Sequence, residues 1–348
     1  MRSTTGHTTT AFLDQLAEYD RTARTAARGY LADPDLSRHL LDPAGDYLDR
    51  NGKGLRPALC LATCEAFGAT VEDAVPSAAA LELLHTAFLV HDDVEDGSEL
   101  RRGKPTLHRL YGPALAVNAG DGLAVLALGA LRDNDQRLGR ALSARVLAEF
   151  VFMARQTVDG QARELGWQRD NRTDLTPDDY LDLIMKKTCW YTTVLPLRVG
   201  ALIGSGGQAD LEPMLRFGFF LGAAFQIRDD VLNLVGSTKR YGKEPLGDLR
   251  EGKRSLILLH LLAAASAADR ARVEAFLALP PERRSDAAVA DLAALVHAYG
   301  SIAFADEFAH GIARSAAAAF EEAFAAVPDS PPRRFVADLV PFMVDRDR

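Results

Sequence analysis

The chain has 348 residues and a formal net charge of -8, with 48% hydrophobic and 25% charged residues. This is the composition of an ordinary globular protein, and the acidic balance without a long basic block argues against nucleic acid as a partner. We find no apolar run of membrane-spanning length and no apolar signal core in residues 1–10, so we expect no transmembrane segment and a cytoplasmic location. The cysteines are few and odd in number, which favours buried thiols over a disulfide framework; they are Cys60, Cys64 and Cys189.

Helix-forming residues dominate from end to end, and we find neither an alternating strand pattern nor a two-residue hairpin signal. Beyond residues 1–10, which we expect to be disordered, the breaks at Gly, Pro and Asp predict helices at 11–32, 35–50, 55–67, 71–94, 106–111, 113–131, 136–165, 177–203, 208–234, 254–267, 269–278, 285–299 and 301–345, the last one broken. Segment 236–253 carries four Gly, three Lys and two Arg, and it predicts a mobile lid. No Pro- or Gly-rich linker divides the chain, so we expect one all-α domain over residues 1–348.

Two short acidic motifs stand out, each directly after a largely apolar helix. The first is DDVED at Asp92–Asp96 and the second is DDVLN at Asp229–Asn233. Residues four apart share one helix face, where like charges repel, so we expect alanine at Asp92 or Asp93 to leave the metal-free fold equally stable or more stable. Magnesium prefers oxygen ligands and typically takes one or two carboxylates together with substrate phosphates. The two motifs therefore predict two acidic walls that hold a magnesium diphosphate between them.

Basic and polar side chains accumulate near these acids, where an anionic substrate would need them. Lys53 and Arg56 lie at a predicted helix start, and helix N-termini attract phosphate. Arg offers a planar fork to phosphate oxygens, whereas Lys offers a point charge. Further candidates are His85, Arg101, Arg102, Lys187, Thr188, Gln226, Lys243 and Lys253.

In this order the motifs resemble those of the polyprenyl synthetase family, the trans-isoprenyl diphosphate synthases. The family pattern Gly-Gly-Lys-x-x-Arg-Pro is matched by Asn51–Pro57, with Asn51 in place of the first Gly. The other matching elements are His91–Asp96, Arg101–Gly103, Lys187–Thr188, Phe225–Asn233, Gly242–Lys243 and Gly252–Arg254. The resemblance covers about residues 50–260. Asn233 replaces the last Asp of the second motif, which leaves open whether it binds metal directly, through water or not at all.

The resemblance implies a fold and a function. The fold would be a single large helical bundle of the isoprenoid synthase type with a central active-site cavity, and the protein would be a homodimer. The activity would be that of a short-chain trans-prenyltransferase, which condenses isopentenyl diphosphate with an allylic diphosphate (dimethylallyl, geranyl or farnesyl).

The resemblance also implies roles for individual residues. A cluster of three Mg2+ per site would be bound by Asp92, Asp93, Asp96, Asp229, Asp230 and Asn233. The allylic diphosphate would be held by Arg101, Lys187, Lys243 and Lys253, and isopentenyl diphosphate by Lys53, Arg56, His85 and Arg102. Thr188 and Gln226 would face the developing allylic cation. The set acting directly in catalysis would then be Asp92, Asp93, Arg101, Lys187, Thr188, Gln226 and Asp229.

Product length is predicted from the helix that carries the first motif. Phe88 and Leu84 precede Asp92 by about one and two turns on the same face. In the family, bulk four and five residues before the first motif limits the growing chain. The bulky Phe88 beside the small Ala87 therefore predicts a C15 to C20 product, with C20 favoured. The alternative is that Phe88 only packs in the core.

Two other functions remain open. A class I terpene cyclase also ionises a prenyl diphosphate, but its second metal motif, Asn-x3-Ser-x3-Glu, would require Glu where this chain has Tyr241. It would also leave the cations of the isopentenyl site without a role. A non-catalytic regulatory subunit of a prenyl synthase would tolerate the loss of metal ligands, whereas the first motif here is complete.

Overall fold

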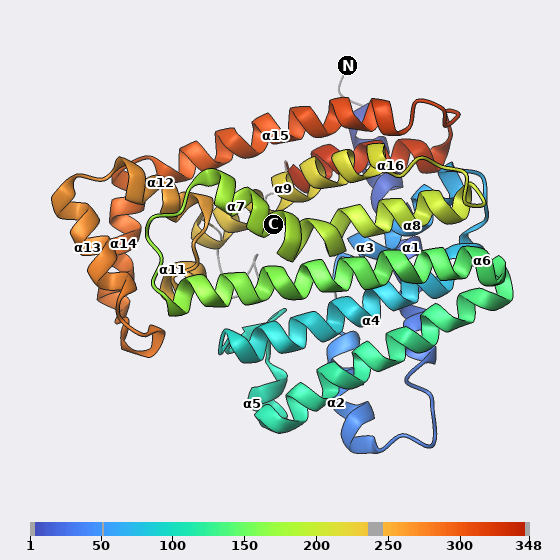
Figure 1. Ribbon diagram of the computed structural model, residues 1–348, viewed down its shortest axis with the longest axis horizontal. Coiled ribbons are helices and arrows are strands. Elements are labelled where there is room, and N and C mark those ends of the chain that lie inside the picture. The colour runs from blue at the N-terminus through green and yellow to red at the C-terminus, as the bar shows by residue number, and fades with distance from the viewer. Residues whose placement is uncertain (1–3, 51, 236–245, 345–348) are drawn as a thin grey trace. The chain divides into compact units, whose positions relative to one another are not determined.

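The computed structural model describes residues 4–50, 52–235 and 246–344, and we refer to these as the described residues. Most of them are helical (Figure 1), which confirms the prediction of an all-α fold. The first helices are α1 (Thr4–Gly29), α2 (Arg38–Leu48), α3 (Leu55–Ala66), α4 (Val71–Glu95), α5 (Leu107–Tyr111) and α6 (Pro113–Arg169). They are followed by α7 (Pro177–Ile184), the π-helix η1 (Met185–Val194), α8 (Leu195–Gly204), α9 (Glu212–Val235) and α11 (Gly247–Glu251). The last are α12 (Leu256–Ala264), α13 (Ala267–Leu277), the 3-10 helix η2 (Pro281–Arg283), α14 (Asp286–Ala298), α15 (Ser301–Ala323) and α16 (Pro331–Val344).

The chain separates into two compact units, each described by itself below. The first unit comprises residues 1–154, 191–218 and 319–339, and the second comprises 155–190, 219–318 and 340–348. Helices α6, α9, α15 and α16 and the π-helix η1 contribute residues to both. A single domain over 1–348 and a central active-site cavity stay predictions. α1 begins at Thr4, inside the segment 1–10 for which we expected disorder.

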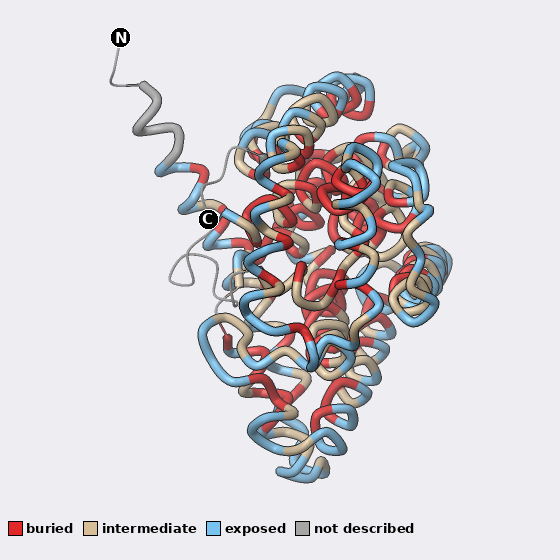
Figure 2. The backbone as a smooth tube through the Cα atoms, turned by 90° about the vertical axis from the view of Figure 1, so that its left-hand side faces the viewer, coloured by how far each residue is buried: buried red, intermediate tan, exposed pale blue. Residues whose placement is uncertain are grey.

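The first unit is built on close packing between α3 and α8. A Cβ atom added to Gly200 would lie 2.5 Å from the Cys60 carbonyl oxygen, and one added to Gly204 would lie 2.4 Å from that of Cys64. Only glycine at these two positions lets the helix backbones approach so closely. All three cysteines are buried thiols, as expected. The buried residues follow the inward sides of the helices, while their outer turns are exposed (Figure 2).

Helix α4 carries the first acidic motif out of this core. It begins with a capping box, in which the Thr70 and Asp73 side chains each bond to the other's backbone region. Its middle is apolar and buried, including Ala78, Ala79 and Ala80. Burial of that segment fixes the helix, and the acidic motif therefore emerges from it at a defined position.

The second unit contains the second acidic motif on α9. It also contains a set of contacts that hold the chain on either side of Lys253. The Arg254 guanidinium donates to the Arg172 carbonyl at 3.0 Å and to the Asn171 side-chain oxygen at 2.8 Å. Gly252 has a φ of 69°, a left-handed backbone conformation that favours glycine. These contacts fix the backbone on both sides of Lys253.

Several predicted boundaries are wrong, each for a local reason. The helix predicted over 177–203 is divided into α7, η1 and α8, because the chain widens into a π-helix over Met185–Val194. The two helices predicted at 113–131 and 136–165 are present as the two arms of α6, but the chain turns back at Gly139 (φ 71°) and not at 132–135 (Figure 1). Strands were not expected, yet β1 (Leu100–Arg101) and β2 (Lys104–Pro105) form a two-residue antiparallel hairpin. Short α11 was also not predicted.

Two described helices are long and apolar enough to cross a membrane, judged by length and composition alone. They are α4, with 25 residues, and α6, with 57 residues. A third span results if the bent pair of α14 and α15 is counted as one. The apolar window of α4 is 72% buried inside the protein, and that of α6 is 39% buried. The expectation that no apolar run reaches this length is therefore wrong, and the absence of a transmembrane segment stays a prediction.

Candidate active site

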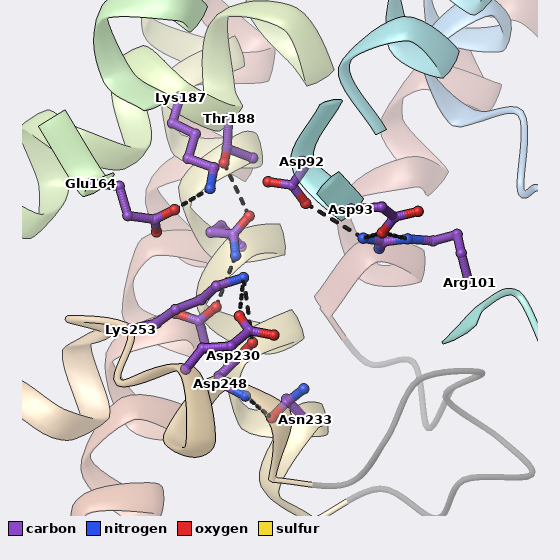
Figure 3. Close-up of polar contacts among 12 residues, drawn as sticks. Asp92, Asp93, Arg101, Glu164, Lys187, Thr188, Asp230, Asn233, Asp248 and Lys253 are labelled. Atoms are coloured by element: carbon purple, nitrogen blue, oxygen red, sulfur yellow. Dashed lines mark hydrogen bonds and ion pairs between the residues drawn. The ribbon is translucent and has the colours of Figure 1, made fainter. Parts of the chain in front are cut away.

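In the first unit, the first acidic motif is paired with an arginine eight residues further along the chain. The Arg101 Nε atom donates to the Asp93 carboxylate at 2.8 Å, and an Arg101 amino group lies 3.4 Å from Asp92 (Figure 3). Asp93 is only 1% exposed and also accepts a hydrogen bond from the Tyr47 hydroxyl. Burial would lower the pKa of Arg101, but Asp93 and Asp92 raise it above its ordinary value. Arg101 therefore stays charged and screens two of the crowded carboxylates.

The small hairpin explains why Arg101 and Arg102 serve different partners. Its turn residues, Arg102 and Gly103, have φ angles of 56° and 75°. Two positive φ values in a two-residue loop are the geometry of a type I′ turn, which asparagine and glycine usually occupy. A non-glycine residue held there carries strain of a kind that gathers at functional sites. The turn directs Arg101 to Asp93 and Arg102 to the Arg50 carbonyl oxygen, 2.8 Å away.

Arg102 belongs to a largely buried group of cations around one carboxylate. Glu82, 3% exposed, lies 3.3 Å from the Arg24 guanidinium. Burial lowers the pKa of Arg102 to about 10, and the nearby Arg24 and Arg56 add to this, while Glu82 opposes it. Burial raises the pKa of Glu82, against the attraction of Arg24 and Arg102. These positive groups would gain stability from a bound anion.

Arg56 and His85 form the other side of this group. One Arg56 amino group donates to the Thr192 hydroxyl at 2.9 Å, and the other lies 3.3 Å from His85 Nε2. The Nε atom of Arg56 and the Nδ1 atom of His85 are buried without a hydrogen-bond partner among the described residues. Burial, and then the charge of Arg56, hold the pKa of His85 well below its ordinary value. The imidazole is therefore neutral and retains an unused polar atom, as does Arg56.

Lys53, the remaining candidate for this group, is exposed and precedes the left-handed Gly54 (φ 60°). A Cβ at Gly54 would lie 2.1 Å from an Asp20 side-chain oxygen, and Asp20 pairs with Arg24 at 3.0 Å. The backbone at Lys53 is thereby packed against the same ionic group. Asn51 lies outside the described residues.

The predicted chain-length face of α4 is neither fully buried nor exposed. Leu84, Phe88, Asp92 and Asp96, spaced four apart, are all half-buried, whereas Ala87 is buried. The ring of Phe88 contacts Tyr191 edge-on, with centroids 5.8 Å apart. A half-buried stripe of this kind, with acids at one end, is consistent with a surface along which the growing prenyl chain lies.

In the second unit, Asp230 is the buried member of the second motif. It is 8% exposed and accepts hydrogen bonds from the Tyr180 hydroxyl and from Gln226 Nε2, each at 2.8 Å. Burial and then the charge of Asp248 raise its pKa from 3.8 to about 8, with Asp229 adding to the shift. Near neutral pH this carboxyl holds its proton unless a cation joins the cluster.

Asn233 has a position that the sequence did not reveal. Its side-chain oxygen accepts a hydrogen bond from the Asp248 backbone nitrogen at 3.2 Å (Figure 3). Its backbone carbonyl accepts one from the Leu246 backbone nitrogen at 3.2 Å. Asn233 thus holds Asp248 beside Asp230. Sequence reasoning missed Asp248 as a site residue, although Lys243 and Lys253 on either side of it were a signal. Lys243 lies outside the described residues.

Lys187 and Thr188 project from the π-helix η1, a rare form that is frequent at functional sites. Lys187 forms an ion pair with Glu164, and the Thr188 hydroxyl donates to the Gln226 side-chain oxygen at 3.1 Å (Figure 3). Lys253 lies 2.9 Å from Glu251 and 3.8 Å from Asp248. Both lysines are therefore held beside carboxylates.

The structure brings the predicted residues together in two groups. The first unit holds Asp92, Asp93, Asp96, Arg101, Arg102, Lys53, Arg56 and His85, and the second holds Asp229, Asp230, Asn233, Lys187, Thr188, Gln226 and Lys253. Within the described residues, no three acidic, histidine or cysteine side chains converge closely enough to hold a metal ion by themselves. That the two acidic walls face each other stays a prediction.

Both acidic motifs lie near the C-terminal ends of their helices. α4 ends at Glu95 and α9 ends at Val235. The C-terminal end of a helix carries partial negative charge and favours cations over carboxylates. Acids gathered there need a cation nearby, and an all-oxygen donor set suits Mg2+, which keeps water and phosphate ligands and needs only one or two carboxylates. The residues present therefore fit magnesium.

Comparisons with known proteins agree with this arrangement. The model of the family described as polyprenyl synthetase matches residues 37–296. The short chain isoprenyl diphosphate synthase of Methanothermobacter thermautotrophicus is 32% identical over 337 residues, covering 96% of this chain and 98% of that protein. The (2E,6E)-farnesyl diphosphate synthase of Mycobacterium tuberculosis is 33% identical over 320 residues, covering 90% and 86%. The crystal structure of geranylgeranyl pyrophosphate synthetase from Pyrococcus horikoshii superposes with a TM-score of 0.85 at 31% identity, covering 98% of this chain and 100% of that one.

Proposed function

The chain belongs to the polyprenyl synthetase family, and we propose that this prenyltransferase condenses isopentenyl diphosphate with dimethylallyl, geranyl or farnesyl diphosphate. The product is a C15 to C20 prenyl diphosphate, with geranylgeranyl diphosphate favoured. Relatives named as short-chain isoprenyl and farnesyl diphosphate synthases, and a structure named as a geranylgeranyl pyrophosphate synthetase, support this range.

The observation that carries the proposal is the cationic group of the first unit. Arg56 and Arg102 lie near one buried carboxylate, Glu82, and Arg56 and His85 each keep a buried polar atom without a partner among the described residues. A diphosphate supplies several strong acceptor oxygens to such a group. A terpene cyclase, which takes only one prenyl diphosphate, gives these residues no function, whereas isopentenyl diphosphate gives them one.

In the proposed reaction, the C1–O bond of the allylic diphosphate breaks and its electron pair leaves with the diphosphate. Arg101, Lys187 and Lys253 stabilise the charge that develops on the leaving group. The double bond of isopentenyl diphosphate then forms the new carbon–carbon bond at C1 of the allylic cation. The new cation lies at C3 of isopentenyl diphosphate, and C2 loses a proton to the released diphosphate as a double bond forms between C2 and C3. Thr188 and Gln226 present oxygen atoms to the allylic cation.

Magnesium, bound by the carboxylates of the two motifs, would act as a Lewis acid on the diphosphate oxygens. The proposed ligands are Asp92, Asp93, Asp96, Asp229 and Asp230, and the proposed number of ions is three. Asn233 holds Asp248 in place through its side-chain oxygen, and the second lone pair of that oxygen stays available to a metal ion or a metal-bound water.

We assign the limit on chain length to Phe88. Its side chain is half-buried on the stripe of α4 that ends at Asp92, and its ring is braced by Tyr191. Ala87 beside it is buried and small, so it leaves Phe88 as the bulky group on this stripe. Leu84 lies one turn beyond and would be met only by a longer chain.

The exposed apolar face of α6 supports a homodimer. In the first unit, Val125 is 64% exposed, and Leu128 and Val151 are also exposed. Exposed apolar side chains on both arms of α6 suit an interface with another protein, and we assign it to a second copy because the exposed Asp121 on the same helix disfavours lipid. Val125→Asp should shift the protein to monomer in sedimentation. A monomeric wild type would contradict the homodimer, and a variant that stays dimeric would place its interface elsewhere.

The test is incubation of the purified protein with isopentenyl diphosphate and each allylic starter, with mass spectrometry of the products. We expect C15 to C20 prenyl diphosphates with Mg2+ and none with a chelator. A cyclic hydrocarbon made from a prenyl diphosphate alone would establish a cyclase instead. Turnover that needs a second protein would point to the regulatory subunit.

A further inference from the structure

Tyr191, which lies outside the family motifs, contacts both the cationic group and the chain-length stripe. The Arg56 guanidinium lies over its ring, 4.5 Å from the centroid. The His85 ring stacks on it at 5.9 Å with an interplanar angle of 26°, and Phe88 meets it edge-on at 5.8 Å and 75°. All four residues belong to the first unit.

The ring orients the anion-binding pair. Arg56 is fixed by Thr192 on one amino group, by His85 on the other and by the Tyr191 ring beneath its plane. Arg56 is half-buried and its Nε atom is buried, and removal from water strengthens a cation–π contact. Without the ring, Arg56 could rotate, and His85 would lose its stacking partner. Their two unpartnered nitrogens would then no longer be held in one arrangement.

The same ring also restricts the side chain of Phe88, the residue that we propose limits the length of the product. His85 and Phe88 are three residues apart on α4 and so lie side by side on its surface. One aromatic ring placed across both restricts the Phe88 side chain by edge-to-face packing. Loss of the ring would let Phe88 turn aside and admit a longer prenyl chain.

We propose that Tyr191 is a specificity-determining residue that couples isopentenyl diphosphate binding to product length. The inference rests on the proposed function, because it assigns a substrate to Arg56 and His85. A substitution of this one side chain of the π-helix must therefore change isopentenyl diphosphate binding and product length together. Removal of a residue that served only the fold would weaken both substrates alike.

The test compares Tyr191→Leu with the matched control Tyr191→Phe. Phe keeps the ring, and the Tyr191 hydroxyl makes no hydrogen bond among the described residues, so this control should behave as wild type within about 2-fold. For Tyr191→Leu we expect the KM for isopentenyl diphosphate to rise about 10-fold, with the allylic KM changed less than about 3-fold. The product should lengthen by one isoprene unit. Tyr191→Met provides a second ringless variant if the leucine protein fails to fold.

A double variant tests whether Tyr191 affects product length through its contact with Phe88. In a Phe88→Ala background, Tyr191→Leu should raise the KM for isopentenyl diphosphate. It should lengthen the product no further, because the Phe88 ring that Tyr191 contacts is already absent. Equal weakening of both substrates, or an unchanged product from Tyr191→Leu, would overturn the coupling.

Titration with inorganic pyrophosphate, without metal, separates this inference from the proposed function. If the wild type makes no prenyl product, the proposed function fails. Pyrophosphate binding weakened about 10-fold in Tyr191→Leu but not in Tyr191→Phe would still support the role of the ring. Equal binding by the two variants would refute that role.

Discussion

Gly160 of α6 lies so close to Lys187 that a Cβ atom at position 160 would come within 2.4 Å of the Lys187 backbone nitrogen. Real Cβ atoms do not approach backbone this closely, so the helix and η1 can touch here only because residue 160 is glycine. The approach places Lys187 beside Glu164 on the same α6 helix.

Gly160→Ala should therefore displace Lys187. We expect a loss of about 1–3 kcal/mol in the free energy of unfolding from overpacking and roughly a 100-fold fall in kcat/KM from misplacement of the lysine. Gly166→Ala is the matched control, because a Cβ there meets nothing within 4 Å. Thermal denaturation and steady-state kinetics of both variants check this. If the two variants behave alike, the close approach has no functional weight.

Asp93→Ala should destabilise the metal-free protein, although the sequence suggested that relief of repulsion would hold or raise stability. Asp93 is buried against Arg101 and Tyr47, so its removal leaves a nearly buried guanidinium without its main partner. Breaking such a pair typically costs about 3–5 kcal/mol. Denaturant unfolding with a chelator present measures the change.

Asp92→Ala is the companion variant. Asp92 is 21% exposed and lies 3.4 Å from Arg101, so its loss should change stability by less than about 1 kcal/mol. Both variants should abolish condensation. Near-normal turnover of either one at saturating Mg2+ would contradict its assignment as a metal ligand.

Arg102→Ala should weaken isopentenyl diphosphate more than the allylic substrate. A lost charged contact to phosphate costs about 1.5–3 kcal/mol, or roughly 10- to 150-fold in KM. Lys53→Ala should act in the same direction, with a smaller effect because Lys53 is exposed. Kinetics with each substrate varied in turn provide the comparison. Equal weakening of both substrates would argue against a separate isopentenyl site, and no weakening would favour the cyclase.

Stability of the metal-free protein should fall as pH rises through the titration of Asp230. Its pKa is raised from 3.8 to about 8 in the folded state, mainly by burial and then by Asp248. Between these values the folded protein holds a proton that the unfolded chain has released, so the free energy of unfolding decreases with pH. The loss is complete above the folded pKa.

The comparison variant is Asp230→Asn, which cannot titrate. The melting temperature of the wild type, measured relative to this variant, should decline from about pH 5 to about pH 9. Parallel pH profiles of the two proteins would show that Asp230 has an ordinary pKa. Mg2+ should bind the wild type more tightly as pH rises, because the metal competes with that proton.

Phe88→Ala should lengthen the product by at least one isoprene unit, because it removes the bulky group on the half-buried stripe of α4. Mass spectrometry of the products measures this. Leu84→Ala alone should leave the product unchanged, since the chain meets Phe88 first. An unchanged product distribution from a folded, active Phe88→Ala enzyme would mean that another element limits chain length.

The sequence by itself determined the helical class, the order of the motifs and the identity of the acids and cations. Helix periodicity is local, so the stripe of Leu84, Phe88 and Asp92 could be read from spacing alone. The same reasoning missed the two-residue hairpin, because Arg102 adopts a positive φ that a non-glycine residue rarely takes. It also missed the π-helix, because the extra residue per turn leaves no clear periodic signal.

Tertiary structure decided what each charged group contacts. That Asp93 is buried on Arg101, and that Asn233 holds the Asp248 backbone, depends on residues brought together across the chain. The contacts of Tyr191 with Arg56 and Phe88 were also decided by the tertiary structure, since nothing in the sequence relates these residues. The physical reason is that burial and ion pairing depend on distance in space, whereas a sequence displays only distance along the chain.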